Sequence, residues 1–161
     1  MEKTENSVPV GLLAKIGAVL FLVWSFLHVY VGVAGLVAFL TGTADSQFQM
    51  LFGGTNAPWS AIVLPTDKVT LNALSHLFGN FVLDVGGYGV LGVFVAWMIW
   101  KQGSWLGYFI GLVVIGISDL AFTFCLVTPG IIPAGWESIS GPVIWVFAVV
   151  ITPFGLPRNR A

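Results

Sequence analysis

Long apolar stretches constrain the fold of this chain more than any other feature. A helix needs about 20 predominantly apolar residues to cross the hydrocarbon core of a bilayer, at a rise of about 1.5 Å per residue. Four stretches reach or approach that length, at about 16–40, 72–100, 104–127 and 138–156. They predict an all-α, integral membrane four-helix bundle, with residues 1–161 forming a single transmembrane domain.

Composition favours the same environment. Only 8% of the 161 residues are charged and 57% are hydrophobic, whereas a soluble domain carries about 25% charged residues. The net charge of -1 provides no basic surface, so we expect no nucleic-acid partner. The one cysteine, Cys125, excludes an internal disulfide and a thiolate-rich metal site.

The connections between the stretches differ in length. The longest, 41–71, is rich in apolar residues, which predicts an ordered loop against the bundle with a short amphipathic helix near 45–52. Pro142 is expected in the first turn of the last helix, where its missing N–H costs little, and Pro153 is expected to kink or end that helix. The first apolar stretch is too long for a signal peptide, so we expect it to be retained as a span.

Basic residues near the ends of the stretches predict the orientation. Cytoplasmic loops carry an excess of Lys and Arg. With four spans, Lys68 falls on one side and the other basic residues fall on the opposite side: Lys3, Lys15, Lys101, Arg158 and Arg160. We therefore expect both termini in the cytoplasm and the loop between the first two spans on the extracytoplasmic side.

Few ionisable side chains lie in or beside the apolar stretches: His28, His76, Asp84, Asp119 and Glu137. Placing a charge at the centre of a bilayer costs at least about 2.5 kcal/mol, so such groups are expected to face protein, water or each other. Estimated from the helical rise, four of them lie in the outer half of the membrane and His28 lies near the middle. This gradient predicts a polar site that opens outward.

The second stretch carries a polar stripe. His76, Asn80 and Asp84 follow at intervals of four, so they share one face of a helix, and Gly87 continues that face. We expect the stripe to line the site, with Asp84 meeting Asp119 of the third stretch across it. Two carboxyl groups in contact would hold one proton at neutral pH, which provides a donor beside an acceptor.

These residues suggest a first hypothesis, the binding and acid–base transformation of a lipophilic small molecule. The candidate catalytic residues are Asp84, Asp119 and His76, which would move protons. The candidate ligand-binding residues are His28, Asn80, Trp24 and Glu137. Whether the protein is an enzyme and which cofactor it uses remain open at this point. No HExxH motif and no ExxH pair of the di-iron bundles occurs in the sequence, and we expect no metal site.

Structural roles explain the same residues. His76 suits the membrane interface, His28 can donate to a backbone carbonyl or to Ser25, and Glu137 favours a helix N-terminus. Asp84 and Asp119 can form hydrogen bonds between helices. Two-histidine haem ligation is disfavoured, because His28 and His76 differ in estimated depth by more than about 10 Å.

A second hypothesis is an accessory or assembly subunit of a larger membrane complex, without chemistry of its own. Its partner would be another membrane protein or a second copy of the chain. Polar groups that point into a cavity favour the first hypothesis. Polar groups that point outward across an open face favour the second.

Overall fold

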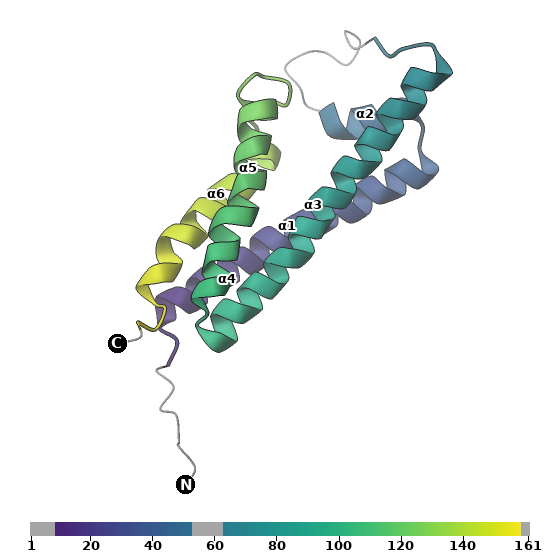
Figure 1. Ribbon diagram of the computed structural model, residues 1–161. Coiled ribbons are helices and arrows are strands. Elements are labelled where there is room, and N and C mark those ends of the chain that lie inside the picture. Colours follow the sequence, from purple (N-terminus) through teal and green to yellow (C-terminus); the bar gives the residue numbers. More distant parts are fainter. Residues whose placement is uncertain (1–8, 53–62, 159–161) are drawn as a thin grey trace.

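The computed structural model describes residues 9–52 and 63–158, and this part of the chain contains helices and no strands. In chain order the elements are α1 (Leu12–Thr41), α2 (Ala44–Phe52), α3 (Lys68–Gln102), α4 (Trp105–Ile110), the π-helix η2 (Gly111–Ile115), α5 (Gly116–Phe122), the π-helix η3 (Thr123–Val127), α6 (Trp136–Ile151) and the 3-10 helix η4 (Thr152–Phe154). Figure 1 shows two long helices, α1 and α3, side by side, with α4, α5 and α6 packed at one end of the pair and α2 near the other end.

Four helical segments are long and apolar enough to cross a membrane: Leu12–Thr41, Lys68–Gln102, Trp105–Val127 and Trp136–Phe154. They coincide with the four stretches expected from the sequence, so the prediction of an all-helical chain with four long apolar helices is confirmed. The short helix expected near 45–52 is also confirmed as α2. The prediction of an ordered loop falls partly on residues 53–62, which lie outside the described residues.

Capping residues determine where α3 begins and ends. The Asp67 carboxylate accepts a hydrogen bond from the Thr70 backbone N–H (2.8 Å), which satisfies one of the free donors of the first turn. That hydrogen bond holds the pKa of Asp67 below its ordinary value. Gly103 ends the helix with a positive φ of 57°, a conformation that glycine adopts without strain.

The prolines of α6 act differently from each other. The helix ends at Ile151 and continues as a 3-10 turn that contains Pro153, as expected. Pro142 lies in the second turn rather than the first, so that prediction is wrong. The reason is that α6 begins already at Trp136, before the apolar stretch.

The pairing of α1 with α3 depends on glycines. Gly32 and Gly86 face each other so closely that a methyl group on Gly32 would collide with the Gly86 backbone. Further along the same contact, Gly89 lies against the backbone of α1 near Val29. Small residues let helix backbones approach closely, which favours packing between apolar helices.

The remaining helices cover only part of this pair. The helix α6 packs on α1, while α4 and η2 contact α3. In Figure 1 these contacts gather at the C-terminal end of α3, and α2 lies beside its N-terminal half. The Gly11 N–H donates to the Gly155 carbonyl (2.9 Å), and the Trp105 indole donates to the Pro157 carbonyl (2.9 Å). The start of α1, the start of α4 and the end of the described chain therefore lie together.

Candidate functional site

The structure separates the site residues expected from the sequence into two groups. Trp24 and Asp119 are buried and lie in contact with the partly buried His28. A second group is exposed along α3: His76, Asn80 and Asp84. Glu137 belongs to neither group. It lies exposed in the first turn of α6, where a carboxylate interacts favourably with the helix N-terminus.

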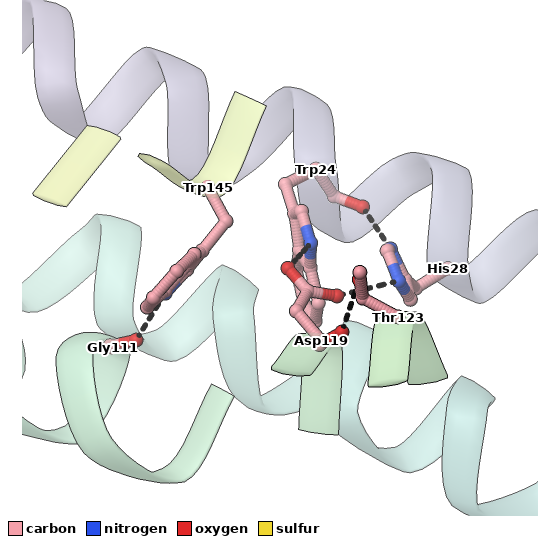
Figure 2. Close-up of polar contacts among 6 residues, drawn as sticks. All are labelled: Trp24, His28, Gly111, Asp119, Thr123 and Trp145. Carbon is pink, nitrogen blue, oxygen red and sulfur yellow. Dashed lines mark hydrogen bonds and ion pairs between the residues drawn. The ribbon is translucent and has the colours of Figure 1, made fainter. Parts of the chain in front are cut away.

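The buried group joins α1 to α5. Trp24 and His28 lie one turn apart on α1 and their rings stack, with centroids 3.7 Å apart. The Trp24 indole N–H donates to Asp119 Oδ2 at 2.9 Å, and Asp119 is only 3% exposed. Figure 2 shows the Asp119 carboxyl group beside the stacked rings, with one oxygen toward the indole nitrogen and the other toward the imidazole. Gly141 of α6 closes the group, because a methyl group there would press on the His28 ring.

The hydrogen bonds of His28 determine where its protons are. Nδ1 lies 2.8 Å from the Trp24 carbonyl oxygen, which can only accept, so Nδ1 carries a proton. This is the backbone contact expected from the structural alternative for His28. Nε2 lies 3.7 Å from Asp119 Oδ1, within ion-pair distance but too far for a hydrogen bond.

An imidazole without a proton on Nε2 would direct its lone pair toward Asp119 Oδ1. One proton on either Nε2 or Asp119 removes that repulsion and leaves the pair without net charge, and a buried net charge is costly. His28 and Asp119 are therefore a basic and an acidic side chain in contact, with no hydrogen bond between them.

Irregular helix surrounds Asp119. It lies on α5, between the π-helices η2 and η3. The Trp145 indole N–H donates to the Gly111 carbonyl (2.9 Å), and the Thr123 hydroxyl donates to the Asp119 carbonyl (2.8 Å), as Figure 2 shows. Single-turn π-helices occur frequently at functional sites. Trp145 is not among the site residues expected from the sequence, although a buried indole N–H usually has a hydrogen-bond partner.

The exposed group runs along α3. The Asn80 side-chain amide donates to Asp84 Oδ2 (2.9 Å), and His76 Nδ1 lies 2.8 Å from the Asn72 carbonyl oxygen. Gly87 continues this face, and an added methyl group there would have no neighbour within 4 Å. Since successive helix residues turn by about 100°, Asn80, Asp84 and Gly87 point away from the glycine contact with α1. His76 lies at the edge of that contact, because its ring centroid is 5.6 Å from that of Phe39 on α1.

The expected contact between Asp84 and Asp119 is therefore absent among the described residues. Asp84 accepts a hydrogen bond from Asn80 on its own helix, and Asp119 accepts one from Trp24 on α1. The physical reason is that α1 occupies the glycine face of α3. The third span contacts α3 through α4 and η2, so α5 carries Asp119 toward α1 instead. The sequence predicted one shared site for the seven candidate catalytic and ligand-binding residues. The structure places six of them in two separate groups, and Glu137 lies outside both.

The described residues define a class of protein, an all-helical bundle of four long apolar helices that carries the buried group around Asp119 and the exposed polar stripe of α3. No protein-family model, no curated protein and no solved structure matches the chain. Its function is therefore inferred from these two groups of residues.

Proposed function

We propose that the chain is a multi-pass membrane protein with four spans and with both termini in the cytoplasm. Support comes from the length and apolar character of the four helices. Support also comes from the charges, because Lys15, Lys101 and Arg158 belong to the end of the bundle where the described chain begins and finishes, and Lys68 begins α3 at the opposite end. The connection between α1 and α3 then lies on the extracytoplasmic side.

In this membrane the protein acts as a subunit of a larger assembly and docks through the polar stripe of α3. The observation that carries this proposal is the exposure of His76, Asn80 and Asp84 along a helix of membrane-spanning length. A carboxylate that faces lipid costs at least about 2.5 kcal/mol, whereas one that faces another protein can be paired. The open position at Gly87 leaves room for a second helix to approach.

The charge of the stripe indicates what the partner carries. Asp84 is acidic, and the Asn80 amide that lies beside it already donates to it. Two copies related by symmetry about the membrane normal would place two Asp84 carboxyl groups at the same depth, where like charges repel. A different polypeptide with a cationic or hydrogen-bond-donating side chain at that depth complements the stripe better.

Site-specific photo-crosslinking tests this docking. A photoreactive side chain at Leu83, an exposed neighbour of the stripe, should form an adduct with a second polypeptide in native membranes. The same group at Val146, which is also exposed and lies on α6, serves as the control and should not form it. Asp84→Leu should lower the adduct yield by about tenfold or more, the effect of losing a buried charged contact of 1.4 kcal/mol or above.

Two outcomes would contradict the docking proposal. Equal adduct yields from Leu83 and Val146 would mean that no partner binds specifically at the stripe. An adduct that joins two differently tagged copies of this chain, and no other polypeptide, would replace the hetero-partner by a homo-oligomer.

A second candidate function is supported by the buried group. We infer from the contact of His28 with Asp119, and from the π-helices on both sides of Asp119, a site for binding and acid–base transformation of a lipophilic small molecule. His28 would be the point of access, because its side chain remains 20% exposed while that of Asp119 is 4% exposed. In this form the site consists of Trp24, His28 and Asp119, without the stripe and Glu137.

A further inference from the structure

A second surface, at the end of the α1–α3 pair where α1 begins and α3 ends, has the features of a lipid site. An apolar groove of about 310 Å³ runs between the two helices. Ala18 and Ala96 form its buried floor, and the half-exposed Trp97 and Trp100 line it from α3. Val19 and Leu22 line it from α1. None of the residues of the buried group or of the stripe lines this groove.

Positive charge lies at one end of the groove. Lys101 is one of its lining residues, and the Lys15 ammonium lies 5.7 Å from the centroid of the Trp100 ring. Within residues 9–52 and 63–158 neither lysine is in an ion pair with an acidic side chain. Two ammonium groups thus lie at the mouth of an apolar channel without a described counter-charge.

We propose that this groove binds an anionic phospholipid, with one acyl chain between α1 and α3 and the phosphate at Lys15 and Lys101. The proposal rests on the proposed membrane location, which places these lysines in the cytoplasmic headgroup layer. Anionic lipids are enriched in that layer, and basic pockets between spans bind their headgroups. An apolar channel alone would accept any lipid tail, so the lysines provide the preference for a negative headgroup. A volume of about 300 Å³ is at the small end for ligand sites, which suits a single chain rather than a protein helix.

Native mass spectrometry of the full chain, extracted in detergent, tests the proposal. Phosphatidylglycerol and phosphatidylcholine with identical acyl chains are added in equal amounts, and the retained lipid is counted. The parent should retain the anionic lipid in excess. Since each lysine near an anionic surface strengthens binding about fivefold, the double variant Lys15→Gln, Lys101→Gln should retain both lipids equally. Lys68→Gln, at the opposite end of α3, should behave as the parent.

A second variant tests the channel separately from the charge. Val93 lines the groove and is 36% exposed, so Val93→Trp should fill the channel without burying a new side chain in the core, and retention of both lipids should fall severalfold. Val113→Trp, which adds the same bulk at an exposed position of η2, should leave retention unchanged.

The outcomes separate this inference from the proposed function. Equal retention of the two lipids by the parent, or an unchanged preference in the double variant, would overturn the lipid site. Displacement of the lipid by millimolar inorganic phosphate would mean that the lysines bind an ion only, which also overturns it. If the chain stayed soluble without detergent, the membrane proposal itself would fail.

Discussion

Two carboxyl groups in the apolar helices, those of Asp119 and Asp84, have opposite surroundings. Asp119 is buried against Trp24 and His28, while Asp84 is exposed and is bonded to Asn80 on its own helix. Removing the first should disturb the chain itself. Removing the second should disturb what the chain binds.

At the residue scale we therefore predict that Asp119→Leu destabilises the chain. The Trp24 indole N–H would lose its acceptor in a buried position, which costs about 1–3 kcal/mol of unfolding free energy. Asp119→Asn keeps an acceptor for the indole and should unfold close to the parent temperature. Asp84→Leu should not destabilise the isolated chain, because it removes an exposed charge. Thermal unfolding in detergent measures all three variants.

The Asn variant also tests the second candidate function. Because it removes the carboxyl group beside His28 and keeps the packing, any small molecule that co-purifies with the parent through this site should be lost from Asp119→Asn and kept by Asp84→Asn. Mass spectrometry of gently extracted protein measures this. Equal retention by both variants would exclude the buried group as a ligand site.

At the scale of elements, the glycines of α3 differ in their surroundings, because some contact α1 and one faces open space. Gly86 meets Gly32 of α1 at the closest approach of the two helices, whereas Gly87 faces open space. Two neighbouring glycines of α3 thus lie on different faces, one against α1 and one on the outer surface of the helix. The proposal that the stripe binds a partner requires that this outer surface is open.

We predict that Gly32→Ala and Gly87→Ala have opposite effects on stability. The methyl group on Gly32 would push against the Gly86 backbone and cost about 1–3 kcal/mol by overpacking. The methyl group on Gly87 meets nothing and gains up to about 1 kcal/mol of helix propensity. The unfolding free energies of the two variants and of the parent, measured in the same detergent, test both predicted changes. A Gly32→Ala variant as stable as the parent would show that the helices do not pack through this contact.

At the scale of the whole molecule, the described chain begins and ends at the same end of the bundle. The hydrogen bond between Gly11 and Gly155 requires this, and it agrees with an even number of membrane crossings. The orientation proposed from the basic residues then assigns Thr66 and Gln102, both exposed, to opposite sides of the membrane.

Cysteine accessibility in intact cells tests this topology. In a Cys125→Ser background, Thr66→Cys should react with a membrane-impermeant maleimide from outside, and Gln102→Cys should react only after permeabilisation. The reverse pattern would invert the orientation. Labelling of both positions from outside would contradict a four-span arrangement.

The sequence by itself determined the four long helices, because apolar length and polar interruption are local properties that need no neighbour. It also placed His76, Asn80 and Asp84 on one face, since helical spacing alone decides which residues share a face. Only the tertiary structure decided which face is covered. Glycines on both α1 and α3 let these two helices pack closely, so Asn80 and Asp84 point away from α1. Asp119 on α5 then contacts Trp24 and His28 instead of Asp84. Which two distant segments pack together depends on how their surfaces fit in three dimensions, and the residue spacing within one segment does not determine that fit.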